Sequence, residues 1–429
     1  MDGQTVSLRK SRFNVNSCMS VFAMALAIVF ALTLLTAHAM EAQTFSVLYN
    51  FTGGADGYAP DAGVTVAPSG VLYGTASLGG THLAGTVFKL RQVNSSWVLS
   101  PLYEFTGVSG GSDPLGGVVI GPNGALYGTT FGDIETYGTV FELTPPPTFC
   151  GTVLCYWNQT VLHTFTGTAG GGGPQVENLV FDSSGNIYGT TQAGGMYNAG
   201  TMFELTPSGG GYTESILHSF GHGTDGRNPL EGVVFDTAGN MYGTAPYGGT
   251  GNPEECTGSC GMVYQLVPSN GGWVENVLVN FDVTNGKNPF ANLIIDSSGN
   301  LYGTTASGGQ NGGGVVYNLA PSGGGFSYSV LYSFSSCGSK GGLALDAASN
   351  FFGVCSGGGA HQDGWVFELT NCSQGCSVID LHDFSGSDGS GPYGAPVLDA
   401  NGNLYGTTTS GGTGNCNGSG CGVVWEITP

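Results

Sequence analysis

The tetrapeptide Leu-Tyr-Gly-Thr recurs along this chain at nearly constant intervals, and this repeat limits the possible folds more than any other feature. Phe352 replaces the tyrosine in one degenerate copy. The tyrosines of the other copies are Tyr73, Tyr127, Tyr188, Tyr242, Tyr302 and Tyr405. A diglycine and a run similar to Gly-Thr-Val-Phe-Glu-Leu typically follow. The repeating unit of about 54 residues therefore predicts one supersecondary module per copy.

The fourth copy shows how one unit divides into apolar runs. Its four runs are Gly232–Asp236, Met241–Ala245, Gly261–Leu266 and Trp273–Phe281. The first two runs are separated by Thr237–Asn240, a tight turn in which Gly239 can adopt positive φ. No helical periodicity occurs in the repeats. Four antiparallel strands per unit are typical of a propeller blade, so we predict an all-β, seven-bladed β-propeller.

The two ends of the repeat region predict how the ring closes. The repeats begin with a lone fourth strand, Thr44–Phe51, and end with a third strand, Gly422–Ile427, that lacks a fourth. Pairing of the N-terminal strand with the C-terminal strand would cover two open sheet edges. A β-solenoid is the alternative, although its coils are usually shorter and need terminal caps. Within each blade, we expect the glycine after the repeated tyrosine to let an aromatic side chain approach the backbone.

Residues 1–39 have the pattern of a secretory signal peptide. Arg9, Lys10 and Arg12 precede the apolar stretch Val21–Leu35, which is followed by Ala37-His38-Ala39. We therefore expect residues 40–429 to form the propeller domain of a secreted protein, located outside the cell, at the cell surface or in the periplasm. No later segment approaches the roughly 20 apolar residues of a membrane helix, so we expect no membrane insertion.

The chain is strongly acidic, with 8 Lys and Arg residues, 29 Asp and Glu residues and a formal net charge of −21. Nucleic-acid binding depends on a basic surface, so this charge excludes nucleic acid as an expected partner. It equally disfavours docking to an anionic membrane. We interpret the acidity as a source of solubility.

Ten cysteines lie beyond residue 39, and an even number in an exported chain is typical of disulfides. Eight of them form close pairs in the sequence, whereas Cys337 and Cys355 share the degenerate sixth copy. The close pairs are Cys150 and Cys155, Cys256 and Cys260, Cys372 and Cys376, and Cys416 and Cys421. Zinc binding is the alternative, but the pairs lie in different repeats and lack the CxxC spacing of zinc sites. We assign no metal site.

The order of motifs in each unit resembles the GloVer (Gloeo/Verruco) tandem repeat of exported bacterial proteins. The third copy carries it as Asp182–Thr191, Gly194-Gly195, Gly200–Pro207 and Leu217–Phe220. The resemblance covers nearly all of the chain beyond the signal peptide, and implies an exported repeat protein without an established activity. Some members carry a C-terminal surface anchor, but no sorting segment precedes Pro429.

The long connections of a propeller emerge on one face, which is the candidate binding surface. The candidate ligand-binding residues on it are Asp56, Tyr58, Asp113, His222, Asp225, Arg227, Tyr247, Lys287, His361, Asp388 and Tyr393. Its tyrosines suit stacking on sugar rings or peptides. The Asp-Gly pairs have an alternative interpretation as turn residues whose carboxylates bind backbone N–H groups.

These features favour an exported, non-catalytic propeller, expected as a monomer, that binds an extracellular carbohydrate, peptide or protein. The chain shows no P-loop, no Gly-x-Ser-x-Gly elbow, no His-Glu-x-x-His and no EF-hand pattern. No catalytic residue and no cofactor are assigned. A polysaccharide lyase or hydrolase that uses Asp56, Asp225 or Asp388 is one alternative, and a structural surface or matrix component is another. The identity of the ligand and the binding of calcium stay open.

Overall fold

A computed structural model describes residues 43–107, 110–132, 137–147, 155–175, 178–250, 256, 260–372 and 375–429. The predicted signal peptide lies outside the described residues. Thr44–Thr428 form one compact unit. Among the described residues, no helix has the length and apolar character needed to cross a membrane.

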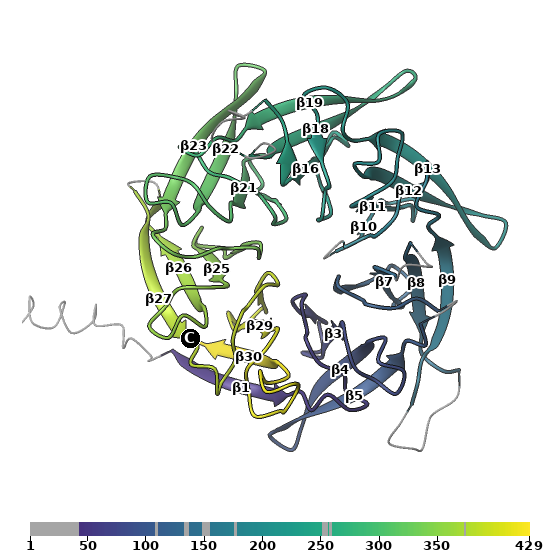
Figure 1. Cartoon of the computed structure of the whole chain (residues 1–429), viewed down its shortest axis with the longest axis vertical. Helices are drawn as coiled ribbons and strands as arrows, with labels where there is room; N and C mark the ends of the chain where they lie inside the picture. The colour runs from purple at the N-terminus through teal and green to yellow at the C-terminus, as the bar shows by residue number, and fades with distance from the viewer. Residues whose placement is uncertain are drawn as a thin grey trace, which may run out of the picture. The chain divides into compact units, whose positions relative to one another are not determined.

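The compact unit is a ring of seven four-stranded antiparallel sheets, which confirms the predicted seven-bladed β-propeller (Figure 1). We number the blades 1 to 7 along the chain and give the strands of each from the centre of the ring outwards. Blade 1 contains β2 (Thr65–Val66), β3 (Leu72–Ala76), β4 (Thr86–Val93) and β5 (Ser96–Glu104). Blade 2 contains β6 (Val118–Ile120), β7 (Leu126–Thr130), β8 (Thr139–Thr144) and β9 (Asn158–Thr164). Blade 3 contains β10 (Val180–Phe181), β11 (Ile187–Thr191), β12 (Thr201–Ser208) and β13 (Gly211–Ser219).

The remaining blades repeat this order. Blade 4 contains β15 (Val234–Phe235), β16 (Met241–Ala245), β18 (Met262–Ser269) and β19 (Gly272–Asn280), and its loops add a small sheet of β14 (Gly226–Arg227) and β17 (Tyr247–Gly248). Blade 5 contains β20 (Ile294–Ile295), β21 (Leu301–Thr304), β22 (Val315–Ser322) and β23 (Gly325–Ser333). Blade 6 contains β24 (Ala344–Leu345), β25 (Phe351–Cys355), β26 (Trp365–Thr370) and β27 (Ser377–Asp383). Blade 7 contains β28 (Val397–Leu398), β29 (Leu404–Thr408), β30 (Val423–Thr428) and β1 (Thr44–Asn50).

Strand β1 closes the ring as the sequence predicts. It pairs antiparallel with β30, from Thr44 opposite Thr428 to Asn50 opposite Val423. Blade 7 is therefore built from both ends of the repeat region. This pairing covers one edge of β30 and one edge of β1, so that neither of these edges is exposed.

The repeated glycine makes room for an aromatic ring, as expected from the sequence. A Cβ atom on Gly189 would lie 2.7 Å from Cζ of Phe203, which faces it on the neighbouring strand. The same conflict would occur in every blade, with rings that are fully buried. The other glycine and ring pairs are Gly74 with Phe88, Gly128 with Phe141, Gly243 with Tyr264, Gly303 with Tyr317, Gly353 with Phe367 and Gly406 with Trp425.

The core lies between adjacent blades rather than within one sheet. One buried cluster, for example, combines Tyr242 and Val263 of blade 4 with Leu301 and Tyr317 of blade 5. The repeated threonine adds a polar link across these interfaces, since its hydroxyl donates to a carbonyl of the next blade. These bonds join Thr75 to Gly116, Thr190 to Glu231, Thr244 to Ala291, Thr304 to Gly341 and Thr407 to Ala62.

A proline fixes the entry of the chain into most blades. Pro114 packs against Gly85, where an added Cβ would lie 2.4 Å from the proline Cδ. The equivalent prolines are Pro60, Pro174, Pro229, Pro289 and Pro392. Blade 6 has Ser339 at this position, and there the disulfide between Cys337 and Cys355 joins the entry segment to β25.

Four of the predicted disulfides are present. They join Cys256 to Cys260, Cys337 to Cys355, Cys372 to Cys376, and Cys416 to Cys421. Cys155 is also disulfide-bonded, and its predicted partner Cys150 lies outside the described residues. The thiols of these bridges are therefore not available as zinc ligands.

Candidate functional site

Two of the predicted loop aspartates are held within turns. Asp56 is buried and accepts hydrogen bonds from the Tyr49 hydroxyl at 3.0 Å and from the backbone N–H groups of Thr52 and Gly54 at 2.7 and 3.1 Å. Asp388 lies 3.0 Å from Nε2 of His382 and accepts the backbone N–H of Ser385 at 2.8 Å. Both carboxylates thus fasten a loop to the outer strand before it, as turn chemistry predicts.

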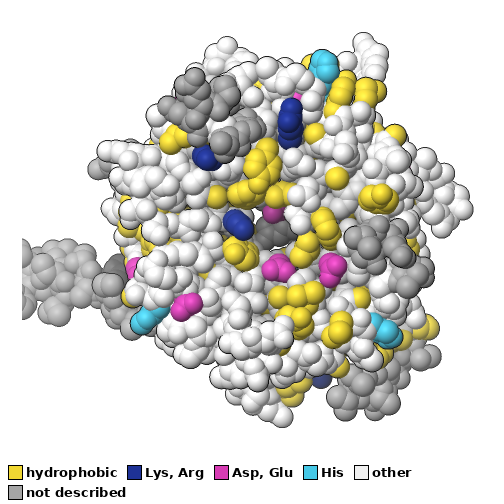
Figure 2. Space-filling model, in the orientation of Figure 1, with side chains coloured by type: hydrophobic (Ala, Val, Ile, Leu, Met, Phe, Trp, Pro, Cys, Tyr) yellow, Lys and Arg dark blue, Asp and Glu magenta, His cyan; other side chains and the backbone are white. Residues whose placement is uncertain are grey.

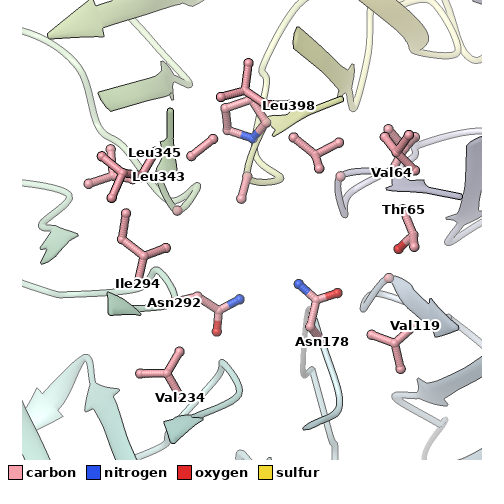
Figure 3. Close-up of a pocket in the computed structure, with 18 of the residues that line it drawn as sticks. Val64, Thr65, Val119, Asn178, Val234, Asn292, Ile294, Leu343, Leu345 and Leu398 are labelled. Atoms are coloured by element: carbon pink, nitrogen blue, oxygen red, sulfur yellow. The ribbon is translucent and has the colours of Figure 1, made fainter. Parts of the chain in front are cut away.

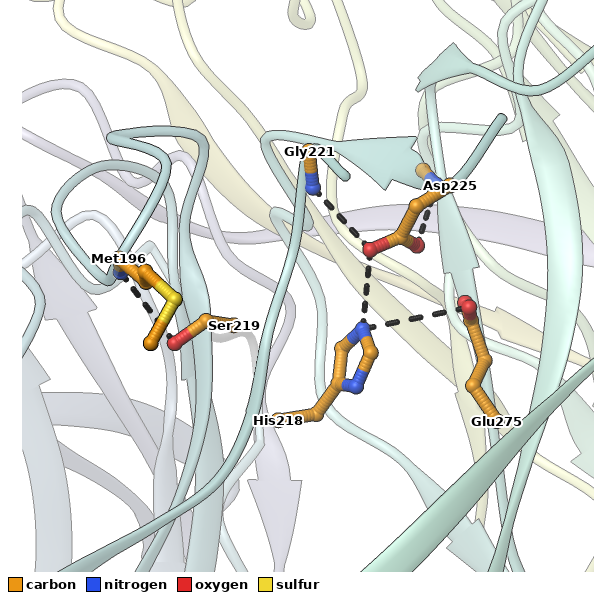
Figure 4. Close-up of polar contacts among 7 residues, drawn as sticks. Met196, His218, Ser219, Gly221, Asp225 and Glu275 are labelled. Atoms are coloured by element: carbon orange, nitrogen blue, oxygen red, sulfur yellow. Dashed lines mark hydrogen bonds and ion pairs between the residues drawn. The ribbon is translucent and has the colours of Figure 1, made fainter. Parts of the chain in front are cut away.

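Asp225 belongs to a polar cluster with His218 and Glu275, between the outer strands of blades 3 and 4 (Figure 4). Nε2 of His218 lies 3.0 Å from Oδ2 of Asp225 and 4.0 Å from Oε2 of Glu275. Burial, reinforced by the neighbouring Asp225, raises the pKa of Glu275 well above its usual value.

The same interface position holds other complementary pairs around the ring. Tyr103 donates to Oε1 of Gln159 at 2.7 Å between blades 1 and 2. His163 lies 3.4 Å from Glu214 between blades 2 and 3, and burial raises the pKa of Glu214 to about 7. The cluster around His218 is therefore one member of a series of contacts between blades, which supports a structural role for it.

The remaining loop residues lie apart on the candidate face. His222 lies against Tyr197, with ring centroids 5.2 Å apart, and His361 is exposed on a loop of blade 6. Arg227 and Tyr247 pair with each other in the small sheet of blade 4. Figure 2 shows the histidines of this face at separate places on its periphery, so they do not form a common metal site.

Three further predicted residues have local backbone roles. Tyr58 pairs with Leu78, and Lys287 pairs with Ser307, in isolated β-bridges. Asp113 has φ of 54°, and its backbone carbonyl accepts the N–H of Leu115 at 2.8 Å. The eleventh residue, Tyr393, lies at a different place, at the centre of the ring.

Residues from all seven blades meet at the mouth of the central channel. A cavity of about 280 Å³ there takes one position from each blade, the residue that follows the entry proline or, in blade 6, Ser339. These seven residues, which we call the mouth ring, are Asp61, Leu115, Gln175, Leu230, Phe290, Lys340 and Tyr393. Glu231 also lines the cavity. Figure 2 shows this central hollow, bordered by acidic, basic and hydrophobic side chains.

Lys340 lies among the aromatic members of the mouth ring. Its Nζ atom is 4.7 Å from the ring centroid of Tyr393 and 5.9 Å from that of Phe290. Both distances are within the range of cation–π attraction, which positions the ammonium group at the mouth.

Asp61 supplies a carboxyl group on the same ring. Burial raises its pKa above the usual value, while a hydrogen bond with Ser77 and the positive charge of Lys340 act in the opposite direction. Acid, base, amide and aromatic side chains thus face one small cavity. Such a set provides hydrogen-bond donors, acceptors and a stacking surface.

Tyr393 is among the residues predicted from the sequence, whereas the other six members of the mouth ring are not. The available signal was the varying residue that follows a repeated proline. Repeats are recognised by the positions that they share, so a position that differs between copies is easily passed over.

One solved structure shows a similar fold at low sequence identity. A candidate 6-phosphogluconolactonase from Bacteroides uniformis is 12% identical, with a TM-score of 0.50, over 83% of this chain and 98% of that chain. A candidate oxidoreductase (glucose dehydrogenase) from Thermus thermophilus is 15% identical, with a TM-score of 0.45, over 90% and 100% of the two chains. The likeness to the first structure, at 12% identity, indicates the fold alone.

A comparison with curated proteins finds no match. A family model described as the Gloeobacter/Verrucomicrobia repeat matches residues 28–170 and 151–343, which together span more than half of the sequence. The chain therefore belongs to the Gloeobacter/Verrucomicrobia repeat family.

Proposed function

We propose that this protein is an exported, non-catalytic propeller that binds a neutral carbohydrate at the mouth of its central channel. The observation that carries the proposal is the mouth ring. Seven equivalent positions of a repeated sequence hold six residue types, and all seven line one cavity. A purely structural position is expected to keep the same residue type from blade to blade, as the repeated glycine does.

The side chains of the mouth ring suit a sugar. Tyr393 offers an aromatic surface, Asp61 offers carboxyl oxygens, and Lys340 and Gln175 offer N–H donors. Sugar hydroxyl groups both donate and accept, so they can satisfy this mixed set. The formal charge of −21 favours a neutral sugar over an acidic polysaccharide, because like charges repel.

Four disulfides indicate an oxidising environment, which supports export to the periplasm or the cell exterior. The positions of the loop aspartates weigh against a hydrolase or lyase. Asp56 and Asp388 use their oxygens to hold turns, and Asp225 pairs with His218 at an interface between blades.

A glycan array tests this proposal directly. Labelled wild-type protein should bind a defined set of neutral glycans, and Tyr393→Ala should weaken that binding roughly fivefold or more, since stacking on one aromatic ring contributes about 1–3 kcal/mol. Tyr197→Ala is the matched control, because Tyr197 is 44% exposed on a loop and does not line the mouth. Absence of glycan binding, or equal loss in both variants, would contradict the proposal.

A further inference from the structure

We infer that the carbohydrate ligand carries a single alkyl tail, which lies in the central channel beneath the mouth ring. The inference rests on the proposed function and names the chemical class of its ligand, a neutral glycolipid-like amphiphile. It comes from the channel below the mouth ring, whose lining differs in character from the mouth.

The channel is lined by the innermost strands of the blades and is almost entirely apolar (Figure 3). Its volume is about 750 Å³, in the range of pockets that enclose a drug-sized ligand. Apolar side chains from every blade line it, among them Val64, Val119, Val234, Ile294, Leu345 and Leu398. Among the described lining residues none is charged.

The mouth and the channel are continuous along the chain. Ala62 lines the mouth and Gly63 lines the channel, and Gly394 and Ala395 are related in the same way. In blade 5 the chain passes from Phe290 at the mouth to Ile294 in the channel. In these blades, the segments that line the mouth therefore lead directly into the segments that line the channel.

Polarity falls in steps along the chain from the mouth to the channel. Charged and aromatic residues form the mouth, and Asn178 and Asn292 follow, with side chains that extend into the channel in Figure 3. Further along the chain in each blade come the apolar residues that line the channel, such as Val234 and Ile294; we call them the apolar band. An amphiphile with a polar head and an apolar tail matches this order, since its head would meet the mouth ring and its tail the band.

An apolar surface of this extent is costly in contact with water, and an alkyl chain would remove it from water without needing hydrogen-bond partners. The channel offers few polar groups to a sugar chain or a peptide backbone. Thr65, one of its polar residues, already donates its hydroxyl to the carbonyl of Val118. The lining therefore selects a hydrocarbon chain over a second sugar unit.

A chain-length series of alkyl glucosides tests the inference. Calorimetric titration of the full protein with glucose and with butyl, hexyl and octyl β-glucosides, each below its micelle concentration, gives the affinity per methylene group. We expect the affinity to rise roughly two- to fourfold per added CH₂ group, as burial of a methylene requires.

Two variants connect this dependence to the channel. Ile120→Asp places a carboxylate in the channel lining, and the side chain of Ile120 is already 36% exposed, so the ring should still fold. This variant should bind octyl glucoside no better than butyl glucoside. Val274→Asp is the control, because Val274 is 50% exposed on outer strand β19, and it should keep the full chain-length dependence.

The outcomes separate the tail from the sugar. Sugar binding whose affinity does not depend on the length of the alkyl chain would contradict the inferred alkyl tail and leave the proposed function intact. A chain-length dependence that is equally strong for alkyl oligoethylene glycols would support the tail and contradict the sugar head. Absence of binding by every glucoside and every glycan would contradict both.

Discussion

The imidazole ring of His382 stacks on the phenyl ring of Phe45, with ring centroids 3.5 Å apart and an angle of 2° between the planes. His382 belongs to the outer strand of blade 6, and Phe45 belongs to β1, the strand from the beginning of the repeats. The N-terminal strand therefore pairs with β30 along its edge and also packs against the preceding blade. Closure of the ring depends on both contacts.

Replacing Phe45 should weaken this closure. Phe45 also packs near Phe384 and Trp425, so Phe45→Ala removes several aromatic contacts at once. We expect a loss of about 2 kcal/mol in the free energy of unfolding, measured with denaturant. Val330→Ala, at a 42% exposed position on another outer strand, should change it by less than about 0.5 kcal/mol. Equal effects of the two substitutions would contradict a special role for the stack.

The glycine of the repeat should not tolerate a side chain. Gly189→Ala would bring a Cβ atom to 2.7 Å from Cζ of Phe203, and the fully buried ring has little room to move. We expect a loss of about 1–3 kcal/mol in stability, as for other overpacked cores. Gly271→Ala is the control, because no atom lies within 4 Å of the added Cβ and the glycine has no positive φ. A melting temperature of Gly189→Ala equal to that of wild type would contradict this packing.

Stability should fall as Glu214 ionises. Burial raises the pKa of its carboxyl from 4.5 to about 7, whereas burial lowers the pKa of the neighbouring His163 and keeps it uncharged at neutral pH. The folded state thus holds the proton of Glu214 more tightly than the unfolded state does. The contribution of this group to stability is fully present below about pH 4.5 and is lost as the pH rises to about 7.

Glu214→Gln should remove this dependence. One pKa unit corresponds to about 1.4 kcal/mol, so the variant should gain roughly 1–3 kcal/mol over wild type between pH 4 and pH 8. Denaturant unfolding at a series of pH values measures the difference. A constant difference between the two proteins across this range would show that Glu214 ionises normally in the folded state.

The disulfide of blade 6 should contribute more to stability than the shorter bridges. Cys337 and Cys355 are 18 residues apart, whereas Cys416 and Cys421 are 5 apart, and a longer loop loses more entropy when it is closed in the unfolded chain. We expect replacement of the Cys337 pair by alanines to cost about 3 kcal/mol, and more than replacement of the Cys416 pair. Equal melting temperatures of the two double variants would contradict this order.

The fold could be predicted from the sequence because each blade repeats the residues that its geometry needs. Gly189 accommodates a ring, Asp182 accepts backbone N–H groups of the turn that follows it, and Thr190 donates to the next blade, so the periodicity of these residues indicates the architecture. The inner strands are shorter than the apolar runs, as in blade 4, where only Val234–Phe235 of the run Gly232–Asp236 pairs. Ends of strands depend on hydrogen bonds to neighbours, which a single run does not specify.

The mouth ring could not be predicted in the same way. Lys340 and Asp61 are far apart in sequence, and neither belongs to a recognised motif. Only closure of the ring brings the residues after the entry prolines to one cavity. Turn aspartates such as Asp56 are predicted as ligand-binding residues because charged loop residues are often functional. Their hydrogen bonds to Thr52 and Tyr49 become visible only in three dimensions.

Competitive labelling of lysines tests the proposed binding site most directly. Lys340 lies in the mouth ring, whereas Lys287 pairs with Ser307 outside it, so the two amines provide an internal comparison. Mass spectrometry measures the rate at which an amine-reactive reagent modifies each lysine, with and without the strongest glycan of the array. The account predicts that the glycan slows modification of Lys340 at least tenfold and leaves Lys287 unchanged. Equal rates at Lys340 with and without a glycan that binds would contradict it.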